Sequence, residues 1–207
     1  MDLLLATNNE HKRTELAQIF NTHRLVTPAN FGISFDYEET AETFRENALG
    51  KALALRDQCI RAGVAEAAGL PVIADDSGLC VAALDGRPGV RSARYGSPDG
   101  GRTELPSAQR NQLLLGELSD AADRSAFFVC CMVAVYEPHR FSIVQETFEG
   151  TIATGPSGSG GFGYDPIFFL PDRGKSVAEL ADDEKNRISH RGKAAAAMAQ
   201  MLETMQP

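Results

Sequence analysis

Basic residues and long apolar runs are scarce in this sequence. Lys and Arg number 20 against 28 Asp and Glu, which gives a formal net charge of −8. A nucleic-acid polymer is therefore a poor candidate partner, because binding to the phosphate backbone needs a basic surface. No apolar run approaches the ~18 residues of a membrane span, and the N-terminus has no basic segment typical of a signal peptide. These absences predict a soluble, cytosolic protein with no membrane partner.

Cysteine and histidine are also few, and their spacing excludes the common zinc sites. The four cysteines form no CxxC pair, and the four histidines form no HxH or HxxxH pair. Cys130 and Cys131 are adjacent in an apolar run, so we expect them to point to opposite faces of a strand as core thiols. The motifs GxxxxGK[ST], GxSxG and HExxH are absent as well, which disfavours P-loop chemistry and the common hydrolase templates.

The 207 residues, 43% of them apolar, are enough for one domain or two closely apposed lobes with a substantial core. Helical spacing of apolar residues predicts helices over residues 10–20, 43–63, 106–118, 176–186 and 189–204. Apolar runs predict strands over residues 2–6, 71–75, 78–83, 125–136, 141–152 and 167–170, with a break at 76–78. Because strands and helices alternate without a linker, we expect an α/β fold with a mixed sheet flanked by helices.

A first candidate site lies at residues 7–12, where the first strand leads into the first helix. Such a turn presents backbone N–H groups and the positive end of the helix dipole to an anion. Thr7 and Asn9 would add hydrogen bonds, and Lys12 would add a positive charge. The same residues are also common as an ordinary helix cap beside a solvated lysine, so the turn alone does not decide between the two interpretations.

A second candidate is acidic. Glu38, Glu39 and Glu42 precede the second helix, and Asp75 and Asp76 follow an apolar strand. One or two carboxylates beside a loop are typical of Mg²⁺ sites, and repulsion between adjacent carboxylates can keep one of them basic. The glutamates are equally typical of favourable charge at a helix N-terminus, whereas the aspartate pair is harder to explain as a simple turn.

The Gly-rich loop of residues 158–163 formally satisfies GxGxxG, yet it does not open a helix after a first strand, so a dinucleotide fold is not indicated. With Phe162 and Tyr164 it can instead form an aromatic wall on which a flat ring stacks, or a plain glycine turn. Lys185, together with His190 and Arg191, could read the edge of a base, clamp a phosphate or form a surface pair.

Several separated blocks together resemble the inosine triphosphatase family, also called Ham1- or RdgB-like, over nearly the whole chain. The blocks are residues 6–12, 39–48, 74–79, 92–95, 160–166 and 188–192. The resemblance implies hydrolysis of inosine, deoxyinosine and xanthosine triphosphates (ITP, dITP and XTP) to the monophosphate and pyrophosphate with Mg²⁺, which cleanses the nucleotide pool. It further implies a cytoplasmic homodimer whose single domain, residues 1–207, has an elongated mixed sheet and two lobes with a substrate cleft between them.

The resemblance also implies roles for individual residues. Asp76 would be the proton acceptor and, with Glu39, a metal ligand. The substrate-binding residues would be Thr7, Asn8, Asn9, Glu10, His11, Lys12, Lys51, Ser77, Phe162, Gly163, Tyr164, Asp165, Lys185, His190 and Arg191. The sequence departs from the family at Asn8 and Ala41, where glycine is usual. Two other functions stay open: a phosphomonoesterase with Asp75 or Asp76 as nucleophile, and a nucleotide-binding sensor without turnover.

Overall fold

The computed structural model describes residues 1–100 and 103–204 of the chain. It divides into two compact units. Unit 1 consists of Met1–Asp76, Cys130–Glu146 and Arg191–Pro207, the last described as far as Thr204, and unit 2 consists of Ser77–Val129 and Thr147–His190. None of the helices within the described ranges is long and apolar enough to cross a membrane.

The strands form a seven-stranded sheet in the order β2-β1-β3-β4-β5-β6-β7. Their bounds are β1 Asp2–Leu5, β2 Arg24–Val26, β3 Val72–Val81, β4 Ser125–Glu137, β5 Arg140–Ile152, β6 Phe168–Leu170 and β7 Lys175–Ser176. β1 is parallel to β2 and β3, whereas β6 is antiparallel to β5 and β7. The predicted α/β fold with a mixed sheet is confirmed. The predicted break at residues 76–78 is wrong, because β3 runs through them without interruption.

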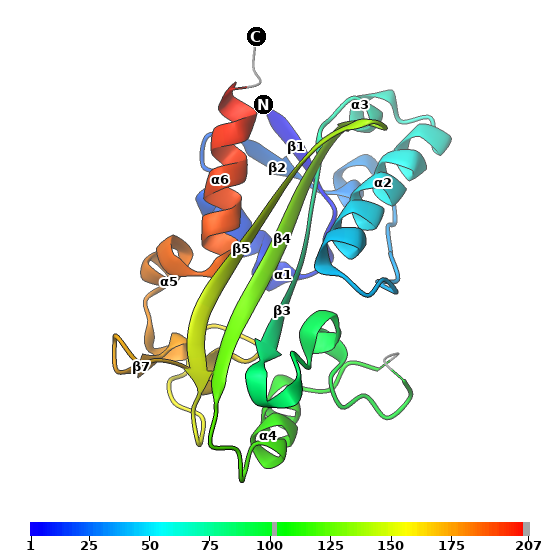
Figure 1. The fold of residues 1–207 in the computed structure, drawn as a ribbon. Helices are drawn as coiled ribbons and strands as arrows, with labels where there is room; N and C mark the ends of the chain where they lie inside the picture. The colour runs from blue at the N-terminus through cyan, green and yellow to red at the C-terminus, as the bar shows by residue number, and fades with distance from the viewer. Residues whose placement is uncertain (101–102, 205–207) are drawn as a thin grey trace. The chain divides into compact units, whose positions relative to one another are not determined.

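The helices are α1 Glu10–Ile19, α2 Phe44–Arg61, α3 Ala65–Ala68, α4 Ser107–Glu117, α5 Asp182–Ile188 and α6 His190–Thr204 (Figure 1). Most lie close to their predicted bounds, and Thr43 caps α2 as its sequence predicts, accepting a hydrogen bond from the Glu46 N–H. The helix predicted over 176–186 is wrong in its first half. Ser176 ends β7 and a 3₁₀ turn follows at Val177–Glu179, so that α5 begins only at Asp182.

Unit 1 has a core on each face of its part of the sheet, because successive strand residues point to opposite faces. On one face Leu4, Val72 and Ala74 pack with α2 residues such as Leu55. On the other face Leu3, Leu5 and Ile73 pack with Leu16 of α1 and Met198 of α6. This alternation decides where the next two residues of β3 point: Asp75 follows Ile73 toward α1 and α6, and Asp76 follows Ala74 toward α2.

Unit 2 has a core of its own, built on the second half of β3. Leu79 and Val81 pack with Leu114 of α4 and with a group of aromatic side chains that includes Phe168.

The four cysteines of the chain are free and buried, and Cys130 and Cys131 are among them, as predicted for core thiols.

Candidate active site

The turn between β1 and α1 is held in shape by its own side chains. Asn9 caps α1, with Oδ1 accepting a hydrogen bond from the Lys12 N–H at 3.1 Å, and Thr7 Oγ1 accepts one from the Asn9 N–H at 3.2 Å. Asn8 donates from Nδ2 to the Phe35 carbonyl at 3.0 Å. Because the positive end of the α1 dipole lies at this exposed turn, the turn can receive an anion without rearranging.

The two departures from glycine cause no backbone strain. Within the described ranges, Asp85 is the one non-glycine residue with a positive φ. Asn8 and Ala41 therefore do not adopt the left-handed conformation that favours glycine.

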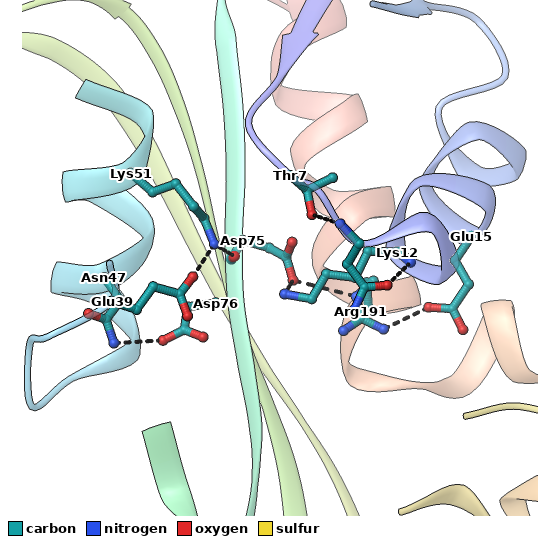
Figure 2. A network of polar contacts seen from close by, with 10 residues as sticks. Thr7, Lys12, Glu15, Glu39, Asn47, Lys51, Asp75, Asp76 and Arg191 are labelled. Atoms are coloured by element: carbon teal, nitrogen blue, oxygen red, sulfur yellow. Dashed lines mark hydrogen bonds and ion pairs between the residues drawn. The ribbon is translucent and has the colours of Figure 1, made fainter. Parts of the chain in front are cut away.

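Asp75 is the centre of a buried charge network on the α1 and α6 side of β3 (Figure 2). Its Oδ2 lies 2.8 Å from Lys12 Nζ and 3.5 Å from Arg191 Nε, and the Arg191 guanidinium reaches Glu15 Oε2 through Nη1 at 2.7 Å. Asp75 is 0% exposed. Burial alone would raise the pKa of Asp75, but Lys12, Arg191 and Lys51 together hold it far below its usual range. Asp75 is therefore ionised at neutral pH.

Asp76 lies on the other side of β3, toward α2, and is 3% exposed. Its Oδ2 accepts a hydrogen bond from Asn47 Nδ2 at 2.9 Å. Burial, followed by repulsion from the Glu39 carboxylate, raises the pKa of Asp76 to about 6. The expectation that its neighbour Asp75 keeps it basic is wrong in its cause, because the two side chains point to opposite faces. A carboxylate with this pKa can accept a proton near neutral pH.

Lys51 joins Glu39 to the strand. Its buried ammonium forms an ion pair with Glu39 and donates to the Asp75 backbone carbonyl at 2.7 Å (Figure 2). Burial lowers the pKa of Lys51, but the carboxylates of Asp75, Glu39 and Asp76 raise it by more, so the ammonium stays charged.

The loop of residues 36–43, called here the Glu39 loop, is anchored to α2 on both sides of Glu39. After Glu39, the Ala41 N–H donates to Asn47 Oδ1 at 2.9 Å. Before it, the Tyr37 hydroxyl lies against Gly50, so closely that a Cβ on Gly50 would be 2.2 Å from the hydroxyl oxygen. The loop therefore depends on both Asn47 and the missing side chain of Gly50.

The acidic residues can accommodate one divalent cation with few protein ligands. Within the described ranges, no group of three or more His, Cys, Asp or Glu side chains could hold a metal ion. Glu39 and Asp76 remain as a pair close enough for their charges to repel, which a cation would relieve. Two carboxylates, with water and phosphate as the other ligands, match the preference of Mg²⁺.

In unit 2, Asp165 organises the Gly-rich loop. Its Oδ2 accepts hydrogen bonds from the Phe162 N–H at 2.8 Å and from Lys185 Nζ at 2.7 Å. The Lys185 ammonium lies 4.6 Å from the centroid of the Phe162 ring. Gly161 is left-handed at φ +67°, and a Cβ there would be 2.2 Å from Asp165 Oδ2. Asp165 thus fixes an aromatic ring and a cation side by side.

Of the other predicted residues of unit 2, Tyr164 and His190 are buried and Gly163 is partly buried. Tyr164 is 4% exposed and donates from its hydroxyl to the Ser92 carbonyl at 2.9 Å, so its ring belongs to the core of unit 2 instead of an exposed wall. The Gly163 carbonyl accepts a hydrogen bond from Asn111 at 3.1 Å. The buried His190 ring stacks on Phe128 with centroids 4.7 Å apart.

The structure thus distributes the predicted residues over the two units. Unit 1 holds Thr7, Asn8, Asn9, Glu10, His11, Lys12, Glu39, Lys51, Asp76 and Arg191, and unit 2 holds Ser77, Phe162, Gly163, Tyr164, Asp165, Lys185 and His190. His190 and Arg191 are neighbours in sequence, yet the Arg191 guanidinium binds the acidic residues of unit 1.

Sequence reasoning did not select Asn47, Glu15 or Asn111. For Asn47 a signal existed, because residues 44, 47, 51 and 55 recur at steps of three and four and so share the buried side of α2 with the apolar stripe. A polar residue at such a position needs a buried partner.

Comparison with known proteins identifies the family. The model of the Ham1 family matches residues 3–201. The chain belongs to the Ham1 family. A dITP/XTP pyrophosphatase of Treponema denticola is 50% identical over 195 residues, which cover 94% of each chain. One of Nitrosomonas europaea is 43% identical over 206 residues, covering 97% of this chain and 93% of the relative.

Solved structures of the family have the same fold. A HAM1 protein from Coxiella burnetii superposes with a TM-score of 0.83 at 37% identity, covering 99% of both chains. The Ham1 protein of Staphylococcus aureus superposes with a TM-score of 0.82 at 36% identity, covering 100% of both chains.

Proposed function

We propose that the protein hydrolyses the non-standard purine nucleotides ITP, dITP and XTP to the monophosphate and pyrophosphate. The names of its Ham1-family relatives, dITP/XTP pyrophosphatase, support this substrate class. The structural observation that carries the proposal is Asp76, a buried carboxylate oriented by Asn47 and kept basic by burial and Glu39. Removing these nucleotides would cleanse the nucleotide pool.

In the proposed reaction Asp76 is the general base. A water oxygen forms a bond to the α-phosphorus, the bridging bond between the α-phosphorus and the β-phosphate oxygen breaks, and Asp76 takes the proton of the water. Pyrophosphate is a good leaving group, so the site needs mainly to place the water in line and to neutralise charge. No covalent intermediate on the protein is required.

Glu39 and Asp76 would hold Mg²⁺, which when bound neutralises charge on the phosphate oxygens. Lys51 contributes by keeping the Glu39 carboxylate at the strand, through its contacts with Glu39 and the Asp75 carbonyl. We assign the triphosphate to the turn before α1 and to the cations near it. The proposed contacts are Thr7, Asn8, Asn9, Glu10, His11, Lys12, Lys51 and Ser77.

The base would be recognised by residues of unit 2. Phe162 offers a ring for stacking, and Lys185, beside that ring, offers a donor to the 6-oxo group of hypoxanthine or xanthine. The 6-amino group of adenine would place a donor against this donor. Gly163, Tyr164, Asp165 and His190 would shape this site, and Arg191 would act on the nucleotide through its charge beside Asp75.

A substrate panel with product detection tests the proposal. The full chain is incubated with Mg²⁺ and ITP, dITP, XTP, ATP or GTP, and both pyrophosphate and orthophosphate are measured. We expect one pyrophosphate for each ITP, dITP or XTP consumed and far slower turnover of ATP. Orthophosphate as the product would instead favour a phosphomonoesterase, and binding without turnover at saturating Mg²⁺ would favour a nucleotide sensor.

We further propose that the chain acts as a homodimer, as its resemblance to the family implies, and that it does so in the cytoplasm, as its sequence predicts. The four free cysteines are consistent with a reducing compartment. Sedimentation equilibrium of the full chain, whose monomer has a mass of 22.3 kDa, distinguishes monomer from dimer.

A further inference from the structure

Asn47 is a completely buried polar residue in α2, at 0% exposure. A buried carboxamide carries two N–H donors and a carbonyl acceptor, all of which have lost water and need partners. Its neighbour Ala48 packs in the apolar core, so the surroundings offer few such partners.

All polar groups of Asn47 are satisfied, by Ala41 in the loop before α2 and by Asp76 in β3. Oδ1 accepts from the Ala41 N–H at 2.9 Å, and Nδ2 donates to Asp76 Oδ2 at 2.9 Å and to the Ala41 carbonyl at 3.4 Å. The orientation of the amide follows from chemistry. An N–H of Ala41 can only donate, and an ionised carboxylate can only accept, so Oδ1 must face Ala41 and Nδ2 must face Asp76.

One side chain therefore connects the Glu39 loop to β3. Figure 2 shows its contact with Asp76. Ala41 lies two residues after Glu39, and Asp76 carries the proposed general base. Because Asn47 donates to Oδ2 of Asp76, it restrains the rotation of this carboxylate.

We infer that Asn47 is a positioning residue, whose amide fixes the Asp76 carboxylate relative to the Glu39 loop. Its kinetic consequence rests on the proposed function, whereas the contact and its effect on cation binding do not. Asn47 touches no reacting atom and acts through Asp76 and Glu39.

Two substitutions separate the contacts. Asn47→Leu has nearly the shape of asparagine and removes all three hydrogen bonds without adding charge. Asn47→Asp keeps the acceptor for the Ala41 N–H, removes the donors to Asp76 and to the Ala41 carbonyl, and adds a negative charge beside Asp76. Asn30→Ala is the matched control, because Asn30 also accepts a backbone N–H in unit 1, that of Thr27 at 2.8 Å, but has no contact with the candidate site.

In steady-state kinetics with ITP, we expect both Asn47 variants to lose about 10–100-fold in kcat, the range typical of residues that orient metal ligands. The KM for ITP should stay within about threefold, because substrate contacts are unchanged. Asn30→Ala should keep the kcat of the wild type. A kcat of both Asn47 variants within about threefold of the wild type, or a loss equal to the unfolded fraction found by urea unfolding, overturns the inference.

A second readout does not depend on turnover. Binding of Mn²⁺ to the nucleotide-free protein is measured by calorimetry, and Asn47→Leu should bind Mn²⁺ about tenfold more weakly than the wild type and Asn30→Ala. Equal affinities overturn the inference. If the wild type releases no pyrophosphate, the proposed function fails while this comparison still decides the role of Asn47.

A measurement on the wild type covers the case in which neither variant folds. Hydrogen exchange should show the Ala41 amide protected well above the neighbouring loop amides, because it donates to a buried acceptor. Exchange as fast as that of its loop neighbours overturns the inference.

Discussion

The carboxyl groups of Asp75 and Asp76 are neighbours in β3, and their pKa values shift in opposite directions. The pleat of the strand separates them: Asp75 meets the cations Lys12 and Arg191, and Asp76 meets Asn47 and the negative Glu39. Two residues of the same type thereby obtain different chemistry, one as a fixed counter-ion and one as a base.

Asp76→Asn should abolish most turnover, by about 10²–10⁴-fold, the usual contribution of a general base. In the metal-free protein it should also be stabilising at high pH. The pKa of Asp76 is raised from 3.8 to about 6, so the folded state loses stability as pH rises through this range. We expect the variant to be more stable than the wild type at pH 8, by about 1–3 kcal/mol, and equally stable below pH ~4. Urea unfolding in EDTA at several pH values measures the difference in free energy of unfolding between the variant and the wild type. A difference that does not change with pH would contradict the prediction.

Asp75→Asn should have the opposite effect on stability. It removes the carboxylate that pairs with the partly buried Lys12 and with the buried Arg191, which keeps only Glu15 among the carboxylates described for it. Loss of one partner from a buried ion pair costs about 3–5 kcal/mol. The pKa of Asp75 is lowered, so its contribution is present at neutral pH and is lost as pH falls through the acid range. Urea unfolding at pH 7 gives the free energy of unfolding of this variant and of Asp76→Asn. If both substitutions changed it in the same direction, the two aspartates would not have the different environments described.

Glu39→Gln should raise the Mg²⁺ concentration that gives the half-maximal rate, because it removes one of two proposed ligands. It should also lower the pKa of Asp76, since Glu39 repulsion is its second largest cause after burial. The neighbouring Glu38→Gln, at an exposed position, is the control. If both variants needed the same Mg²⁺ concentration for the half-maximal rate, Glu39 would not be a metal ligand and would only add negative charge near the start of α2.

Gly161→Ala should raise the KM for nucleotides and destabilise unit 2. The new methyl would meet Asp165 Oδ2, which must then release Phe162 or Lys185. Gly174→Ala separates this effect from backbone strain, because Gly174 has a similar φ of +64° and nothing within 4 Å of a built Cβ. Equal KM values for the two variants would mean that Asp165 does not organise the loop. Steady-state kinetics with ITP and thermal melting supply the comparison.

Phe162→Ala should lower kcat/KM for ITP and XTP by a similar amount, about 1–3 kcal/mol, the range for a base stacked on an aromatic ring. Phe141→Ala, at a half-exposed position in unit 1, should leave kcat/KM unchanged. If kcat/KM of Phe162→Ala were unchanged, Phe162 would not stack on the base and the Gly-rich loop would be a plain turn.

Local signals in the sequence were sufficient for most elements. The Thr43 and Glu46 pair predicted the start of α2, because the capping contact lies within one turn of chain, and Thr43 does accept a hydrogen bond from the Glu46 N–H. At Ser176 and Glu179 a full capping box starts only a 3₁₀ turn, so the helix predicted from residue 176 begins later, at Asp182. A capping box fixes where a turn begins and carries no information on how far it continues.

The contacts that define the site could not be predicted in this way. Arg191 and Asp75 are 116 positions apart, and Asn47 and Asp76 are 29 apart, so no local spacing relates them. The strand pattern did allow one prediction. Because side chains alternate along a strand, residues 75 and 76 must point to opposite faces of the sheet. Interpreting the pair as two mutually repelling carboxylates neglected that geometry.

The two anchors of the Glu39 loop, Tyr37 against Gly50 and Ala41 on Asn47, are both on α2, and Lys51 of the same helix holds Glu39 itself. Three contacts with α2 therefore hold Glu39 in place relative to this helix. Any sliding of this helix along β3 would carry Glu39 past Asp76 and change the spacing of the two carboxylates. The separation on which cation binding depends is thus set by the packing of a whole helix, and substitutions in the apolar stripe of α2, far from any carboxylate, can tune it.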